Sequence, residues 1–273
     1  MTCPMLSATP TLHDIETATE ANLCAYVRGF GVIPGTQLLD DAEGLRLLTP
    51  DVPNPFFNSI IRTRLSPVPH EARAAIQRII QPYDDVFLPM MWWLSPLSQP
   101  FNLADLLQAE MFHLETHPSL WLPLARLTPP TPTPPTFRIT RVQSDEVLRQ
   151  WIKVNSAPYD FLDYINEAFF TGYSGQGYGA DVPLRHYIGW LDDVPVGCST
   201  MLLASGVAGI YSVATLPDAR GRGIGTAMTH APLIEARGEG YQVGILSASE
   251  EGYGLYRRMG FEDYGQTDMY VRY

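Results

Sequence analysis

Three glycines and two arginines crowd the seven residues from Arg220 to Thr226, and this segment most constrains how the chain can fold. An apolar run, Ile210 to Thr215, precedes it, and an amphipathic run, Ala227 to Arg237, follows it. This order predicts a strand, a glycine-rich turn and a helix. Such a turn aims several backbone N–H groups at one point, at the positive end of the helix dipole, and binds phosphate oxygens.

Two common phosphate-binding motifs do not fit the segment. A P-loop requires Lys followed by Ser or Thr after its last glycine, and no lysine stands here. A dinucleotide-binding turn requires glycine at its first, third and sixth positions. The sixth residue is Thr226 when counting starts at Gly221, and Met228 when it starts at Gly223. What remains is Arg-x-x-Gly-x-Gly after a strand.

A second motif lies nearer the C-terminus. Ser249 to Phe261 is typical of a short helix that ends in Tyr-x-x-x-Gly-Phe, with the tyrosine at Tyr256, and an apolar strand, Val243 to Leu246, precedes it. In this order the two motifs resemble the GNAT superfamily of acyl-CoA N-acetyltransferases, over roughly Phe137 to the C-terminus. A glycine turn with a purely structural role is the alternative.

The resemblance implies acetyl-CoA as co-substrate, with its diphosphate held by the loop. It also implies that the strand before the loop binds the pantetheine arm and splays from the next strand around Leu246. The thioester would lie in the gap, with an N–H near Val213 as oxyanion donor. The residues expected to bind the coenzyme are Val213, Ala214, Thr215, Arg220, Gly221, Arg222, Gly223, Ile224, Gly225, Thr226, Ser249 and Tyr253.

The resemblance places Tyr256 near the coenzyme sulfur, where its phenol would protonate the leaving thiolate as a general acid. Tyr253 lies one turn earlier on the same helix and competes for this role. Ser249 stands where the family often carries asparagine, which weakens one expected contact. No general base is identified. The carboxylates that come into question are Glu250, Glu251, Asp160, Asp163 and Glu167.

These features predict an N-acetyltransferase in which a primary amine attacks the bound thioester directly, without a covalent enzyme intermediate. The amine acceptor is not identified, and the chain is expected to be a monomer or a homodimer. The alternative is a non-catalytic acyl-CoA-binding sensor or scaffold module, which the missing base favours.

Composition narrows the partners and the compartment. The formal net charge is −11 over 273 residues, and no basic stripe appears, so nucleic acid is not expected as a partner. Charges and prolines interrupt every apolar run, so no membrane association is expected. Three widely spaced cysteines and the lack of a signal-peptide pattern at the start favour a cytoplasmic protein with reduced thiols.

A proline-rich linker divides the chain. Residues 128–136 contain five prolines and cannot form a helix or a central strand. We therefore expect an α/β chain with a mixed (α+β) sheet, built from tandem GNAT-like domains, each a mixed, mostly antiparallel sheet flanked by helices. The predicted domains are 1–127, a degenerate GNAT-like copy, and 137–273, the acetyltransferase. An unrelated α+β domain is the alternative for the first half.

The first half lacks the phosphate loop. Where the loop should fall, Leu65 to His70 contains two prolines and no glycine, so this half is not expected to hold a diphosphate in the same way. Farther on, His113, Glu115 and His117 alternate along a predicted strand. Three such side chains can bind zinc, but an exposed polar strand face is the favoured interpretation, and no metal is expected.

Overall fold

The structure is a computed structural model, and it describes residues 5–179 and 181–273. In the first half it contains α1 (Leu12–Arg28), β1 (Gln37–Asp41), β2 (Gly44–Leu48), β3 (Ser59–Ile61), α2 (Pro69–Asp84), β4 (Met90–Leu94), α3 (Leu103–Leu107) and β5 (Phe112–Pro123). In the second half it contains β6 (Phe137–Arg141), α4 (Asp145–Ser156), α5 (Asp163–Ser174), β7 (Leu184–Leu191), β8 (Val194–Ala204), β9 (Val207–Thr215), α6 (Ile224–Gly238), β10 (Val243–Ser247), α7 (Glu250–Arg258) and β11 (Glu262–Arg272).

The mixed α/β fold, with helices flanking a mixed sheet, is confirmed. Helix α5 begins only at Asp163, because Asp160 adopts a left-handed backbone (φ 48°) that a helix cannot include. Strand β11 starts at Glu262, where it pairs with β5.

The strands of both halves join in one sheet, in the order β1-β2-β3-β4-β11-β5-β10-β9-β8-β7-β6. The final strand of each half lies among the strands of the other half. Strand β11 pairs antiparallel with both β4 and β5, and β5 pairs antiparallel with β10. The two halves are therefore held together by hydrogen bonds between their strands as well as by the proline-rich linker, residues 128–136. The domain boundaries themselves remain a prediction.

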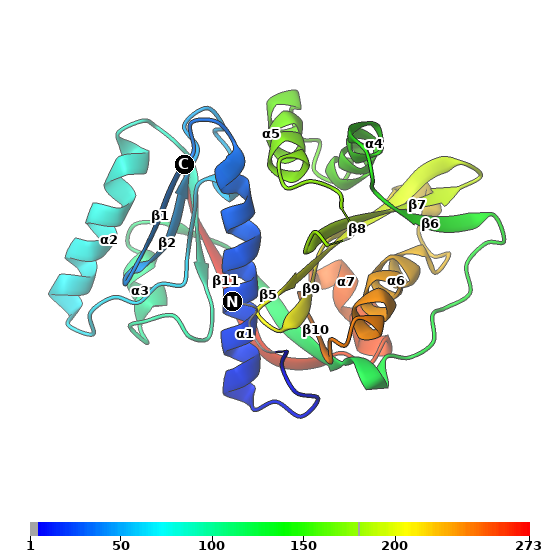
Figure 1. Ribbon diagram of the computed structural model, residues 1–273. Coiled ribbons are helices and arrows are strands. Elements are labelled where there is room, and N and C mark those ends of the chain that lie inside the picture. Colours follow the sequence, from blue (N-terminus) through cyan, green and yellow to red (C-terminus); the bar gives the residue numbers. More distant parts are fainter. Residues whose placement is uncertain (1–4, 180) are drawn as a thin grey trace.

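Helices cover both faces of the sheet (Figure 1). Helices α1, α4 and α5 share a core with the strands of one face, in which Trp151 and Tyr173 are fully buried. Helices α6 and α7 share a core with the opposite face of the second half, and α2 and α3 do so in the first half. Burial of these large side chains supplies the main driving force for the assembly.

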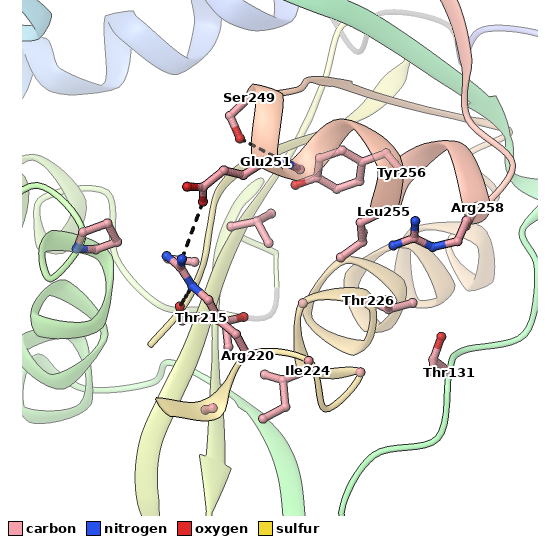
Figure 2. A pocket seen from close by; sticks show the side chains of 18 of the residues that line it. Thr131, Thr215, Arg220, Ile224, Thr226, Ser249, Glu251, Leu255, Tyr256 and Arg258 are labelled. Atoms are coloured by element: carbon pink, nitrogen blue, oxygen red, sulfur yellow. Dashed lines mark hydrogen bonds and ion pairs between the residues drawn. The ribbon is translucent and has the colours of Figure 1, made fainter. Parts of the chain in front are cut away.

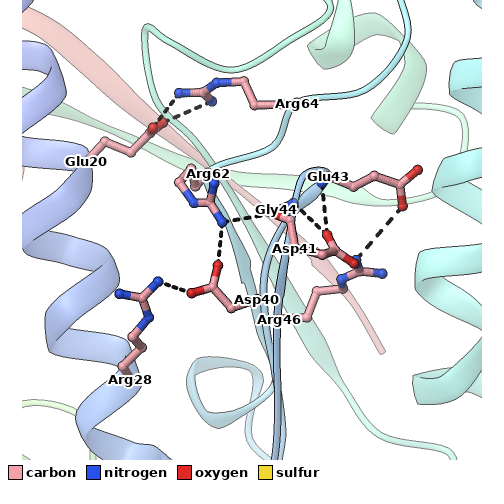
Figure 3. Close-up of polar contacts among 9 residues, drawn as sticks. All are labelled: Glu20, Arg28, Asp40, Asp41, Glu43, Gly44, Arg46, Arg62 and Arg64. Atoms are coloured by element: carbon pink, nitrogen blue, oxygen red, sulfur yellow. Dashed lines mark hydrogen bonds and ion pairs between the residues drawn. The ribbon is translucent and has the colours of Figure 1, made fainter.

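Helix α1 is fixed to the first half by a network of ion pairs (Figure 3). Arg28, at its C-terminal end, pairs with Asp40 on β1, and Arg62 donates to the same carboxylate at 2.5 Å. About two helical turns earlier, Glu20 pairs with Arg64. A cation in the last turn is also favourable for the helix dipole. The network holds α1 in place above the centre of the sheet, next to β9.

No helix in the described ranges is both long and apolar enough to cross a membrane.

Candidate functional site

Strands β9 and β10 diverge at their C-terminal ends. They run parallel, and their pairing stops at Gly209 and Ile245, although β9 continues to Thr215. A bulge follows: the register of β9 with β8 shifts between residues 211 and 214, and Ser212 adopts φ 51°. Bulges bend a strand away from its neighbour. One edge of β9 is therefore open to a ligand over its last residues, as the resemblance implied.

The glycine-rich turn at the start of α6 presents free backbone donors. Gly221 and Gly223 adopt left-handed φ angles of 73° and 77°, and Gly223 caps the helix. Within the described ranges, no acceptor is bound to the backbone N–H groups of residues 221 to 226, and the first helical bond runs from Ala227 N to Gly223 O. These donors and the helix dipole suit an anion.

The proline-rich linker packs directly on this turn. A β-carbon on Gly223 would lie 2.6 Å from the carbonyl oxygen of Pro132, so only glycine fits between the linker and the helix. Farther back in the linker, the hydroxyl of Thr128 donates to the carbonyl of Met259, next to α7, at 3.3 Å. The linker is therefore ordered against α6 and α7, and Thr131 reaches the site.

A cavity of about 510 Å³ joins the turn, the open edge of β9 and the start of α7. Figure 2 shows Arg220 and Thr215 on one side and Leu255 and Tyr256 on the other. The predicted site residues that line it are Val213, Ala214, Thr215, Arg220, Gly221, Gly223, Ile224, Gly225, Thr226, Ser249 and Tyr256. The volume and the free donors suit the diphosphate and arm of a coenzyme A thioester.

Two predicted binding residues lie outside the cavity lining. Arg222 lies within the turn, but its side chain is exposed and does not line the cavity. Tyr253 points away, and its hydroxyl donates to Asp263 on β11 at 3.0 Å. This hydrogen bond to a carboxylate is the main reason that the pKa of Tyr253 is raised. Of the two tyrosines on α7, the structure therefore brings only Tyr256 to the cavity.

Tyr256 is almost buried, with 8% of its surface exposed, and its ring packs edge-on against Phe261 at 5.9 Å. Burial raises the pKa of Tyr256 to about 12, while the nearby hydroxyl of Thr229 opposes the shift. The phenol is thus protonated at neutral pH, which a proton donor requires. Ser249 caps α7 by accepting a hydrogen bond from Gly252 N at 3.2 Å.

An ion pair spans the mouth of the cavity. The Nη1 atom of Arg220 lies 3.7 Å from Oε2 of Glu251, and its Nε donates to the carbonyl of Thr215 at 3.2 Å. The side chains of Arg220 and Glu251 are 49% and 82% exposed. Solvent therefore screens the ion pair, and its contribution to the free energy of unfolding is small. An arriving phosphate would compete with Glu251 for the guanidinium.

Among the carboxylates considered as bases, only Glu251 lines the cavity. Asp160 and Asp163 are exposed, and Glu167 is held by Arg149 at 2.6 Å on the surface. Within the described ranges no three His, Cys, Asp or Glu side chains gather as a metal site would require. The sequence reasoning also missed several residues of the wall, which come from the linker, the α4–α5 loop and α7: Thr131, Pro158, Tyr159, Leu255 and Arg258.

Comparisons with known proteins agree with this geometry. Residues 183–263 match the family model of the acetyltransferase (GNAT) domain. No curated protein matches the sequence.

Solved structures share the fold over most of the chain. A GCN5-related N-acetyltransferase from Kribbella flavida has 20% sequence identity and a TM-score of 0.68, covering 92% of this chain and 95% of that one. A functionally unknown conserved protein from Staphylococcus epidermidis has 15% identity and a TM-score of 0.66, covering 88% and 94%. A tandem GNAT protein from the clavulanic acid biosynthesis pathway has 15% identity and a TM-score of 0.62, covering 98% and 97%. Residues 183–263 thus match the GNAT domain that the two motifs predicted, within a chain that shares the fold of these solved structures.

Proposed function

We propose that the chain is an acetyl-CoA-dependent N-acetyltransferase that transfers the acetyl group to a primary amine by direct attack. The observation that supports this most is the single cavity in which the free N–H groups of residues 221–226, the open edge of β9 and the phenol of Tyr256 meet. The GNAT domain over residues 183–263 supports acyl-CoA chemistry in general.

Each part of the cavity has a role in this proposal. The turn and Arg220 hold the coenzyme diphosphate, and Arg258, on α7, adds a second cation at the same wall. The edge of β9 from Val213 to Thr215 aligns the pantetheine arm through backbone hydrogen bonds. A backbone N–H near Val213 stabilises the oxyanion that forms when the amine attacks.

The leaving thiolate takes its proton from Tyr256. A free thiol has a pKa near 8.5 and a free phenol one near 10, so transfer is slightly uphill in water. Burial raises the pKa of Tyr256 to about 12, but the same dry cavity also disfavours the thiolate and increases its demand for a proton. The phenol need donate only as the sulfur charge develops.

The proposal is tested by calorimetric titration with acetyl-CoA and by thiol release with a broad panel of amines. We expect binding, thiol release with at least one amine, and a fall in kcat of about 10²-fold for Tyr256→Phe at unchanged acetyl-CoA affinity. No binding of acetyl-CoA would refute the proposal. Binding without thiol release for any amine would instead favour the acyl-CoA sensor or scaffold, and a larger loss in Tyr253→Phe would move the acid role to that residue.

A further inference from the structure

Strand β5, from the N-terminal half, borders the gap in which the thioester would lie. Its last pair with β10 joins Ser119 to Ser247, and Ala248 N then donates to the carbonyl of Pro118 at 2.9 Å. The next residue, Ser249, lines the cavity. Strand β10 ends here, whereas β5 extends on to Phe112. The residues of β5 that precede Pro118 therefore flank the opening, opposite the free edge of β9.

Alternation along β5 decides which side chains face the acceptor side. Trp121 packs with Ala18 of α1, and the hydroxyl of Ser119 lies 3.1 Å from that of Thr267. Leu120 and Leu122 belong instead to the core beneath α6 and α7. His117 and Glu115 follow Ser119 at intervals of two and so lie on the α1 face, opposite the helices that line the coenzyme cavity.

His117 and Glu115 form a pair on this face. Nε2 of His117 lies 3.0 Å from Oε2 of Glu115, and the two side chains are 22% and 51% exposed. No residue in the described ranges hydrogen-bonds to Nδ1 of His117. His113 does not join them, because the register with β11 shifts at Leu114 and turns His113 toward Thr116 and Asp268 instead. A carboxylate on one ring nitrogen leaves the other free to accept a proton.

An aromatic side chain faces the same opening from the α4–α5 loop. Tyr159 lines the cavity, is 66% exposed, and stacks on Phe161 at 5.0 Å. Partial desolvation raises the pKa of the Tyr159 phenol although much of the residue is exposed, and the negative charges of Glu115 and Glu251 add to the shift. An aromatic ring within reach of the charges of two carboxylates suits an organic ammonium ion.

We infer that the acceptor is a cationic alkylamine, that Tyr159, Glu115 and Glu251 hold its ammonium group, and that His117, contributed by the N-terminal half, takes its proton. This inference rests on the proposed function. It assigns the general base that the sequence left unidentified, and it gives the N-terminal half a part in the reaction through β5, which lies between β10 and β11 in the sheet.

The protons balance as follows. The ammonium gives its first proton to Nδ1 of His117, and Glu115 stabilises the resulting imidazolium, which later returns the proton to solvent. The amine lone pair then forms the C–N bond, and the C–S bond breaks as Tyr256 protonates the sulfur. The nitrogen's second surplus proton restores the Tyr256 phenol. The products are the amide, coenzyme A and one released proton.

The test compares two acceptors in the full-length chain: the best alkylamine from the amine panel and the best arylamine, whose nitrogen is already unprotonated at neutral pH. His117→Gln should lower kcat/KM for the alkylamine by about 10²-fold and for the arylamine less than threefold. Added imidazole should restore part of the alkylamine rate. Glu115→Gln should reduce the alkylamine rate by about tenfold, because it leaves the imidazolium without its partner. His70→Gln, on the exposed start of α2, is the matched control and should change neither rate.

Calorimetry with acetyl-CoA separates the outcomes. Unchanged affinity in His117→Gln shows that the coenzyme site is intact, so equal losses for both acceptors, or no loss for either, would overturn the inference while the proposed function stands. If His117→Gln loses acetyl-CoA binding, the test moves to Glu115→Gln and to the ratio of its kcat/KM for the alkylamine to that for the arylamine. A ratio equal to that of the wild type would also overturn the inference. If the wild-type chain releases no thiol with any amine, the proposed function itself fails.

Discussion

The hydroxyl of Tyr211 donates a 2.7 Å hydrogen bond to the side-chain oxygen of Asn22 and so joins the strand at the edge of the cavity to the first helix of the chain. The amide nitrogen of Asn22 donates to the carbonyls of Leu202 and Ala204 at 3.3 and 2.8 Å. Asn22 is fully buried. Gly209 permits this contact, since a β-carbon there would lie 2.2 Å from the Asn22 oxygen. The two halves therefore share a buried polar junction beside the site.

Asn22→Ala is expected to lower the free energy of unfolding by about 2–4 kcal/mol. The change removes three hydrogen bonds and leaves buried polar groups on Tyr211, Leu202 and Ala204 without partners, which costs more than the bonds themselves contribute. Urea unfolding measures the effect. Asn102→Ala is the control, because Asn102 is exposed and its side chain makes no capping bond. Equal stability of the two variants would contradict a structural role for the junction.

The fragment 137–273, expressed alone, is expected to be insoluble or largely unfolded. It lacks β5, so β10 loses its antiparallel neighbour, and β11 loses its partners on both sides, β4 and β5. Unpaired strand edges and the apolar surface that α1 leaves promote aggregation. Sedimentation and circular dichroism of the fragment test this. A soluble, cooperatively folding and fully active fragment would show that β5 is dispensable for both stability and the reaction.

Local patterns made the fold and the centre of the site readable from the sequence. The turn around Gly223 and the helix that carries Tyr256 depend on residues near one another in the chain, and apolar runs located β9 and β10 beside them. The sequence could not predict that β11 lies among the strands of the first half. The strand is compatible with several neighbours, and only tertiary packing selects β4 and β5. The motif favoured Tyr256 over Tyr253 for the acid role, but only the structure shows that the hydroxyl of Tyr253 is engaged elsewhere, by Asp263.

The linker and loop residues at the site escaped prediction for a related reason. Composition identified residues 128–136 as extended, but it carries no information about what an extended segment packs against. The contact of Pro132 with Gly223 brings Thr131 to the cavity, and the left-handed Asp160 lies in the α4–α5 loop that brings Tyr159 there. Glycine at position 223 was attributed to phosphate binding alone, whereas the linker also requires it.

Gly223→Ala is expected to lower the free energy of unfolding by about 1–3 kcal/mol and to weaken acetyl-CoA binding. The new β-carbon meets a backbone carbonyl at 2.6 Å, and alanine is strained at φ 77°. The turn or the linker must move, and either shift disturbs the N–H groups that hold the anion. Gly238→Ala, at the end of the same helix with no neighbour within 4 Å, should be neutral or slightly stabilising. Thermal unfolding and calorimetry check both variants, and unaltered affinity in Gly223→Ala would show that the linker contact is independent of the site.

His186 is expected to make the protein sensitive to acid. Its ring is buried, with Nδ1 bound to the hydroxyl of Thr200 at 2.7 Å and Nε2 without a partner in the described part of the chain. Burial lowers the pKa of His186 from 6.5 to about 3. Below pH 6.5, His186 therefore binds a proton in the unfolded chain but stays neutral in the folded chain until the pH approaches 3. The free energy of unfolding is therefore unaffected by His186 above pH 6.5 and decreases as the pH falls toward 3. The decrease due to His186 is about 3 kcal/mol between pH 7 and pH 4.

His186→Leu should remove this part of the acid response. Urea unfolding of wild type and variant from pH 7 to pH 4 should show the difference in unfolding free energy, wild type minus variant, falling by about 3 kcal/mol over the range. The comparison cancels the carboxylates, which titrate in both proteins. His13→Leu, at the exposed start of α1, should run parallel to wild type throughout. If the His186→Leu curve also stays parallel, His186 is protonated in the folded chain, and solvent reaches the core between α4 and β7 that packing against Trp151 and Tyr173 is expected to exclude.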